Sequence, residues 1–168
     1  MTATIRKEQE NDIDAIGRIN LAAFQTIEHS SQTEHFIVNA LRGRGELTVS
    51  LVAVENDQII GHVALSPVLI ADGSESWFGL GPVAVLPGCQ RKGVGSLLIT
   101  EALAELQSLQ PSGCVVIGDP YFYSRFGFVA EPRLFLADVP AEYFQVLLIK
   151  GELPEGEVRY SKAFEAQK

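Results

Sequence analysis

The residues best suited to chemistry lie in segment 83–96, where an apolar run meets a helix through glycines and cations: Val-Ala-Val-Leu-Pro-Gly-Cys-Gln-Arg-Lys-Gly-Val-Gly-Ser. The first turn of a helix leaves backbone N–H groups without partners, and the helix dipole adds positive charge there. Gly93 and Gly95 would let phosphate oxygens approach these N–H groups, while Arg91 and Lys92 add formal charge. The segment therefore predicts a pyrophosphate site. In the alternative interpretation, the glycines only close a tight turn and the cations are solvated.

Two better-known phosphate motifs do not fit this segment. The chain contains no Gly-Lys-Ser or Gly-Lys-Thr, which excludes a Walker-type loop as a sequence match. A dinucleotide-binding fingerprint needs a third glycine at the position that Leu98 occupies.

The elements on either side of the glycines predict a strand–helix–strand unit. Apolar residues recur at helical spacing after the glycines, at Val94, Leu98, Ala102 and Leu106. Residues 114–118 then form a continuous apolar run, typical of a buried parallel strand. Because such crossover units are right-handed and compact, we expect residues 83–85 and 115–117 to be neighbours. A ligand would bind where the carboxyl ends of the two strands diverge.

A short helix is predicted directly after the second strand. Asp119 can act as its N-cap, Pro120 suits the first helical position and Gly127 can end it, so the helix should span residues 121–126. Phe122 and Phe126 are four residues apart and should share its buried face.

The remaining elements are predicted from periodicity and turn residues. A strand at Thr4–Lys7 precedes a helix at Ile13–Phe24, capped by Asn11 or Asp12. A second helix should begin at the capping box Ser31-Gln32-Thr33-Glu34 and end at Gly43. Further β-prone runs occupy residues 49–55, 59–65, 68–71, 77–85, 146–149 and 158–160, the first two forming a hairpin. Gly79, Gly81 and Pro82 predict a bulge or a splayed edge inside the run 77–85.

Length and charge limit the function classes. A chain of 168 residues suits one domain, residues 1–168, and a net charge of −8 argues against broad binding to nucleic acid. Cys89 and Cys114 form no metal-binding spacing, so we expect reduced thiols and no metal. The charged N-terminus and the lack of a run of about 20 apolar residues predict a cytoplasmic protein without membrane association.

Particular motifs resemble the GNAT N-acetyltransferases. Gln90, Gly93 and Gly95 have the spacing Gln-x-x-Gly-x-Gly after Val-x-Val-x-Pro, which is similar to the acetyl-coenzyme A (acetyl-CoA) signature of that family. Gly-His-Val at 61–63, Leu-Gly-Pro-Val-Ala-Val at 80–85 and the segment 118–128 resemble its bacterial YhbS-like branch. The resemblance implies the GNAT α/β fold, a mixed and mostly antiparallel sheet with splayed parallel central strands, flanked by helices.

The same resemblance implies roles for individual residues. Backbone amides of the loop would bind the pyrophosphate, and Gln90 would shape the turn. The main chain of the preceding strand would run beside the pantetheine arm. Tyr123 occupies the position whose phenol protonates the departing thiolate; a packed aromatic residue is the alternative interpretation. The implied acetyl-CoA-binding residues are Val83, Ala84, Val85, Gln90, Arg91, Lys92, Gly93, Val94, Gly95, Ser96, Asp119, Ser124 and Phe126.

The group that accepts the proton of the attacking amine is left open. Residues 80–85 contain no carboxylate, although many family members place one on that strand. Glu28, Glu34 and His62 are the candidates, but a capping role explains Glu34 and a structural role is more common for a histidine such as His62.

The resulting hypothesis is an enzyme that transfers acetyl from acetyl-CoA to a primary amine of a small molecule or peptide, by direct attack in a ternary complex. A CoA-binding sensor without catalysis is the alternative, and a donor with a longer acyl group is a third hypothesis. Arg125 could bind phosphate or a carboxylate or be solvated, while Trp77 and Phe78 could line the acceptor pocket or the core. The oligomeric state, a homodimer included, stays open.

Overall fold

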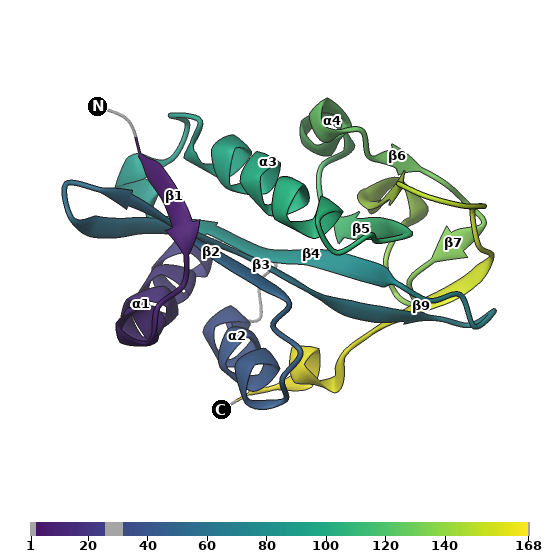
Figure 1. Ribbon diagram of the computed structural model, residues 1–168, viewed down its shortest axis with the longest axis horizontal. Coiled ribbons are helices and arrows are strands. Elements are labelled where there is room, and N and C mark those ends of the chain that lie inside the picture. Colours follow the sequence, from purple (N-terminus) through teal and green to yellow (C-terminus); the bar gives the residue numbers. More distant parts are fainter. Residues whose placement is uncertain (1–2, 26–31, 168) are drawn as a thin grey trace.

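The computed structural model describes residues 3–25 and 32–167, which form a mixed sheet with helices on both faces (Figure 1). The strands are β1 (Thr4–Lys7), β2 (Val49–Glu55), β3 (Gln58–Ile70), β4 (Trp77–Val85), β5 (Gly113–Ile117), β6 (Val129–Ala130), β7 (Leu134–Phe135), β8 (Phe144–Leu148) and β9 (Gly156–Tyr160). The helices are α1 (Ile13–Phe24), α2 (Glu34–Gly43), α3 (Val94–Gln107) and α4 (Pro120–Tyr123). Short 3-10 turns lie at Glu10–Asp12, Pro87–Cys89, Ser124–Phe126, Ala141–Tyr143 and Lys162–Glu165.

The sheet is mostly antiparallel, as predicted. Its order is β1-β2-β3-β4-β5-β8-β6, with β9 paired to β3 and to β7. The pair β4 and β5 is parallel, and so is the pair β7 and β9. The α/β fold class inferred from the sequence is therefore confirmed.

The parallel pairing of β4 with β5 lies earlier in the chain than we predicted. Trp77–Leu80 pairs with Gly113–Val116, whereas residues 83–85 pair only with β3. Gly81 has φ +139° and Pro82 has no N–H to donate, so the ladder to β5 cannot continue past them. The two strands consequently diverge after Leu80, which is the splay implied by the family resemblance.

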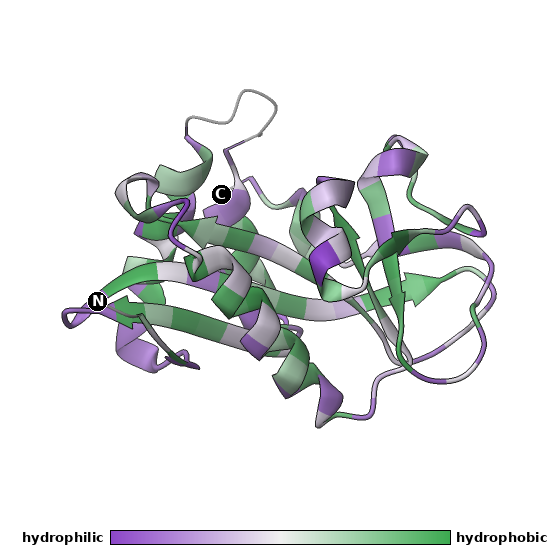
Figure 2. Cartoon of the chain, turned by 90° about the horizontal axis from the view of Figure 1, so that it is seen from above, coloured by the Kyte–Doolittle hydropathy of each residue, from purple (hydrophilic) through white to green (hydrophobic). Residues whose placement is uncertain are grey.

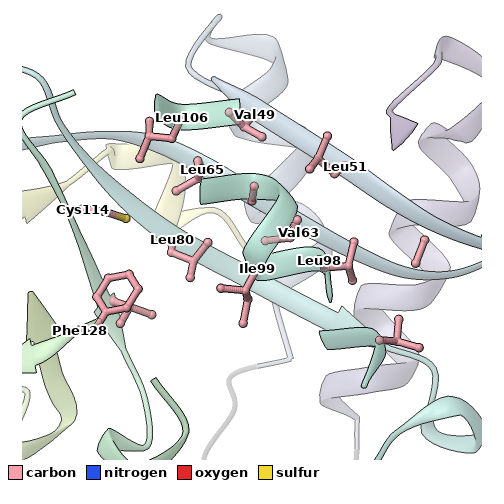
Figure 3. Packing of buried hydrophobic residues seen from close by; sticks show 14 of the residues in the cluster. Val49, Leu51, Val63, Leu65, Leu80, Leu98, Ile99, Leu106, Cys114 and Phe128 are labelled. Atoms are coloured by element: carbon pink, nitrogen blue, oxygen red, sulfur yellow. The ribbon is translucent and has the colours of Figure 1, made fainter. Parts of the chain in front are cut away.

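Two apolar layers hold the sheet between its helices. Figure 1 shows α3 and α4 on one face and α1 and α2 on the other. Leu98, Ile99 and Leu106 of α3 pack on the sheet, as Figure 3 shows. On the opposite face, Ile19 and Ala23 of α1 pack on Ala84 of β4. Hydrophobic residues accordingly concentrate along the strands, and hydrophilic residues gather at the loops (Figure 2).

Several local predictions need correction. Residues 59–65 and 68–70 belong to one strand, β3, and residue 71 lies in the turn that follows. Pro67 lies between the last residue paired to β2, Leu65, and the first paired to β9, Val68. A missing N–H is tolerated at that change of partner.

The caps of the first two helices also differ from the prediction. Asp12 occupies the N-cap position of α1 as predicted, but its buried side chain accepts hydrogen bonds from Gln9 N and the Arg6 guanidinium and does not cap the helix. Ser31 of the predicted capping box lies outside the described residues, and Thr33 is the N-cap of α2. None of the helices in the described part of the chain has the length and apolar character needed to cross a bilayer.

Candidate active site

The loop between β4 and α3 presents unpaired backbone donors. Gly93 is the N-cap of α3 and has φ +84°, a left-handed conformation that favours glycine. The first bond of the helix runs from Leu97 N to Gly93 O over 3.0 Å. The N–H groups of Val94, Gly95 and Ser96 therefore have no carbonyl partner within the helix.

These donors face a hollow of about 330 Å³. It is lined by Val85, Cys89, Gln90, Arg91, Gly93, Val94, Gly95, Ser96, Phe122 and Arg125. Gln90 spans the turn by donating a hydrogen bond from Nε2 to Val85 O over 3.1 Å. Arg125 adds a cation from the opposite wall, with its Cζ 5.6 Å from the centre of the Phe122 ring. Lys92 is exposed beside the hollow and does not line it.

Positions 93 and 95 of the loop are glycine for different reasons. At position 93, the left-handed φ is by itself a sufficient reason for glycine. Gly95 does not have a positive φ, and a Cβ built on it would meet its nearest neighbour, Val85 Cγ2, at 3.8 Å, an ordinary contact. The turn therefore does not require glycine at 95. A glycine there keeps open the space above the helix N-terminus, which favours an anion site over a purely structural turn.

The free edge of β4 leads away from this hollow. Leu86 N donates to Ile60 O of β3 over 2.9 Å. Because successive N–H groups of a strand alternate in direction, those of Val85 and Val83 point away from β3, toward the gap that β5 leaves. The Ala84 side chain is buried against α1 and, by the same alternation, its N–H points toward β3, so Ala84 offers no polar group to this edge.

A second cavity, of about 560 Å³, opens at the gap between β4 and β5. Its lining comes from both faces of the sheet and consists of Phe24, Glu34, Ile37, Leu80, Gly81, Pro82, Val83, Ile117, Tyr123, Leu136, Ala137, Tyr160 and Phe164. Val83 lines this cavity and Val85 lines the first hollow. The free edge of β4 thus connects the two.

Tyr123 reaches the cavity from α4 across the end of β5. Its ring lies so close to Gly118 that a Cβ on that glycine would be 2.3 Å from Tyr123 Cε2. Phe122 and Phe128 hold the ring in edge contacts, with centroids 5.0 and 5.9 Å away. Burial raises the pKa of Tyr123 to about 12. The phenol is therefore a proton donor at neutral pH.

Three of the predicted acetyl-CoA-binding residues lie away from the β4–α3 loop. Asp119 Oδ1 accepts from Tyr121 N over 2.9 Å, and Ser124 Oγ donates to Tyr121 O over 3.0 Å. Both residues line a separate hollow on the outer side of α4, and Phe126 packs against the core and the Phe122 ring. The structure does not bring these three side chains to the β4–α3 loop.

The candidates for proton acceptor occupy different places. His62 is fully buried between Asn20 Nδ2, 3.4 Å from its Nδ1, and Ser50 Oγ, 2.8 Å from its Nε2. Burial chiefly lowers the pKa of His62 to about 4, and His62 lines neither cavity. Glu34 lines the same cavity as Tyr123, and Glu28 lies outside the described residues.

Two candidates for the lining of the acceptor pocket, Trp77 and Phe78, pack in the apolar core. Trp77 is 2% exposed and packs in the apolar cluster under β9, and Phe78 packs on the α3 side. Sequence reasoning missed Gly118 and Tyr160. The small residue before Asp119-Pro120 was a usable signal for Gly118, but no local pattern identifies Tyr160. Within the described residues, no cluster of three metal-ligating side chains occurs.

Comparisons with known proteins show the family of this chain. Residues 46–130 match the acetyltransferase (GNAT) domain model. The uncharacterized N-acetyltransferase YhbS of Escherichia coli K12 is 38% identical over 120 residues, which is 71% of this chain and 70% of that protein.

Two crystal structures are similar over nearly the whole chain. A GNAT family acetyltransferase from Brucella melitensis, in complex with acetyl-CoA, has TM-score 0.86 and 44% identity, covering 96% of this chain and 97% of its own. E. coli YhbS in complex with CoA has TM-score 0.87 and 31% identity, with coverages of 99% and 93%. This chain therefore belongs to the GNAT family of N-acetyltransferases and is an acyltransferase.

Proposed function

We propose that this protein transfers the acetyl group of acetyl-CoA to a primary amine by direct attack in a ternary complex, and that residues 1–168 act as one domain. The observation that carries this proposal is the free edge of β4, which joins the hollow at the β4–α3 loop to the cavity of Tyr123. The similar structures from B. melitensis and E. coli, with acetyl-CoA and CoA bound, support the same donor. The two free cysteines suit a reducing, cytoplasmic setting.

The residues present fit the donor from end to end. The N–H groups of Val94, Gly95 and Ser96, with Arg91 and Arg125, would hold the pyrophosphate. The backbone of Val83 and Val85 would bind the pantetheine arm in the manner of an added strand. An N–H of this edge near Val85 would polarise the thioester carbonyl.

The transfer step balances with the groups at the cavity. The amine nitrogen bonds to the acetyl carbon, the carbon–sulfur bond breaks, and the sulfur takes the phenolic proton of Tyr123. The proton that the nitrogen loses returns to the phenolate through solvent. Burial raises the pKa of the Tyr123 phenol, and burial also raises the pKa of a thiol, as at Cys114. The proton balance between phenol and thiol is therefore less disturbed than either pKa alone suggests.

Direct attack is supported by the side chains that line the Tyr123 cavity. Among the described lining residues there is no Cys, Ser, Thr, Lys or His to form a covalent acetyl intermediate. Cys89 lines the other hollow and Cys114 is buried in the core. A sensor without catalysis is not favoured, because such a role gives no reason for a buried phenol beside the free edge of β4.

The test compares Tyr123→Phe with a matched control, Tyr121→Phe, whose side chain is 86% exposed. Thiol release from acetyl-CoA with pooled amines gives kcat, and calorimetry gives the Kd of acetyl-CoA. We expect Tyr123→Phe to lower kcat by about 10²-fold or more with Kd within about twofold, and the control to match the wild type. Equal kcat in both variants would remove Tyr123 from the mechanism. Binding without turnover on any amine would favour the sensor, and better rates with longer acyl donors would change the donor.

A further inference from the structure

The acceptor side of the Tyr123 cavity combines one carboxylate with an apolar wall. Glu34 of α2 is the only charged side chain among its described lining residues, and Tyr123 and Tyr160 are the only other side chains with polar atoms. No described cation lines the cavity. An ammonium group would meet an opposite charge there, whereas a carboxylate would enter an apolar cavity without a cationic partner.

Tyr160 is the unexplained polar group of this cavity. It lies at the end of β9, and its ring covers Gly79, where a Cβ would come within 3.0 Å of Tyr160 Cε2. Phe164 packs against the other side of the ring, with centroids 4.9 Å apart. The hydroxyl is buried and has no hydrogen-bond partner among the described residues. A buried hydroxyl without a partner destabilises the fold, so its presence in a side chain that lines this cavity points to a ligand.

The state of this phenol is well defined. Burial mainly, and then the neighbouring Cys114 and Tyr123 side chains, raise the pKa of Tyr160 above its usual range. The hydroxyl is therefore neutral and can accept a hydrogen bond from an N–H group.

The acceptor side lies across the sheet from the donor hollow. Glu34 belongs to α2 and Phe164 to the C-terminal turn, which Figure 1 shows together on the face opposite α3 and α4. The donor hollow lies between the start of α3 and α4. An amine can thus approach the gap between β4 and β5 without passing the donor.

We propose that the acceptor is a hydrophobic primary amine, an alkyl- or arylalkylamine without a carboxylate next to its amino group, which Glu34 attracts and the Tyr160 hydroxyl positions by accepting a hydrogen bond from the attacking nitrogen. This inference rests on the proposed acetyl transfer. The ammonium loses its proton to solvent before attack, and Tyr160 itself exchanges no proton. Tyr160 is thus a positioning residue.

A panel of amines tests the substrate class. It contains 2-phenylethylamine, its carboxylated counterpart phenylalanine, and the hydrophilic ethanolamine, each assayed by thiol release with acetyl-CoA. We expect kcat/KM for 2-phenylethylamine to exceed that for phenylalanine by about 10²-fold and that for ethanolamine by about tenfold or more. Equal or reversed preferences would overturn the inference while leaving acetyl transfer intact. Turnover of no amine, despite acetyl-CoA binding, would instead refute the proposed function, and this inference with it.

Variants test the two side chains. Tyr160→Phe should raise KM for 2-phenylethylamine about tenfold, leave the Kd of acetyl-CoA unchanged, and raise Tm by about 2 °C or more because it removes an unpaired buried hydroxyl. Glu34→Gln should weaken calorimetric binding of the amine to the CoA-loaded protein and narrow the preference over phenylalanine. Tyr121→Phe and Glu101→Gln, at exposed positions, are the matched controls. Unchanged amine kinetics, amine binding and Tm in Tyr160→Phe, or an unchanged preference in Glu34→Gln, would refute the corresponding role.

Discussion

Gly118→Ala is the substitution that tests most directly how the fold positions Tyr123. Gly118 follows β5, and a Cβ on it would lie 2.3 Å from Tyr123 Cε2 and 3.0 Å from Cδ2. Its φ is not in the left-handed region, so alanine fits the backbone. The clash with the phenol ring is therefore the main expected cost of the methyl group.

The size of the displacement follows from these distances. Ordinary contact begins at 3.4 Å, so the ring must move by about 1.1 Å, the difference between 3.4 and 2.3 Å. Phe122, Phe126 and Phe128 surround the ring with centroids 5.0, 6.4 and 5.9 Å away, which limits its freedom to yield. Overpacking of this kind costs about 1–3 kcal/mol in the free energy of unfolding. A shift of about 1 Å in a reacting group costs about 10²-fold in rate.

The assay separates an effect on the position of Tyr123 from an effect on the binding of acetyl-CoA. We expect Gly118→Ala to lower kcat for thiol release by about 10²-fold and to lower the free energy of unfolding in urea by about 1–3 kcal/mol. The Kd of acetyl-CoA should change less than about threefold, since the residues that line the hollow at the β4–α3 loop do not include Gly118. Gly17→Ala in α1 is the control, because no atom lies within 4 Å of its built Cβ. That variant should be slightly more stable and equally active.

A double-mutant cycle identifies the cause. If Gly118→Ala acts through the ring, the same substitution in a Tyr123→Ala background should cost little further activity or stability. A wild-type kcat in the single variant would refute the reasoning. Fully additive losses in the double variant would refute it as well.

Two further predictions concern the loop and the core. Gly95→Ala should change the free energy of unfolding by no more than about 1 kcal/mol, because the added Cβ meets only Val85 Cγ2, at 3.8 Å. The same variant should raise the Kd of acetyl-CoA, measured by calorimetry, about tenfold or more. An unchanged Kd would contradict an anion site at the N-terminus of the helix. His62, which faces Glu8 and Arg42 through Ser50, has its pKa lowered to about 4, so the unfolded chain binds a proton more readily than the folded protein between about pH 6.5 and 4. Stability should therefore fall by about 2–3 kcal/mol between pH 7 and 4.5 in urea titrations, and a His62→Gln variant that kept the full loss would disprove this assignment.

Local chemistry explains which parts of the site could be predicted from the sequence. Gly93 stands where a helix start needs a left-handed residue, and Asp119-Pro120 with Gly127 delimits the helical segment that carries Tyr123. These signals act over a few residues, so the loop and the position of Tyr123 on its helix are encoded locally. The short helix ends in a 3-10 turn at Ser124–Phe126, a detail that the same pattern does not distinguish.

The acceptor side could not be predicted, because it depends on pairing between distant segments. Tyr160 reaches the cavity only because β9 pairs with the last residues of β3, which themselves follow the change of partner at Pro67. The sequence pattern predicts residues 59–65 and 68–71 as separate runs, and without one continuous β3 there is no reason to place the C-terminal strand beside Gly79. The predicted pairing of β4 with β5 was wrong for a related reason, because hydrophobic periodicity does not show where the hydrogen-bonded pairing of two strands stops.

One irregularity in the sheet creates both halves of the site. If β4 paired with β5 along its whole length, the N–H groups of Val83 and Val85 would donate to β5 and no cavity would open beside Leu80. Gly81 and Pro82 end that ladder, and residues 83–85 remain paired with β3 beyond a shift in register between Val63 and Leu65, so the N–H groups of Val83 and Val85 have no partner strand. Recognition of acetyl-CoA by such an edge would use only backbone groups and would therefore leave the side chains of these residues free to vary. Under the proposed function, we therefore expect selectivity among amines to arise on the acceptor side, where Glu34 and Tyr160 supply polar atoms.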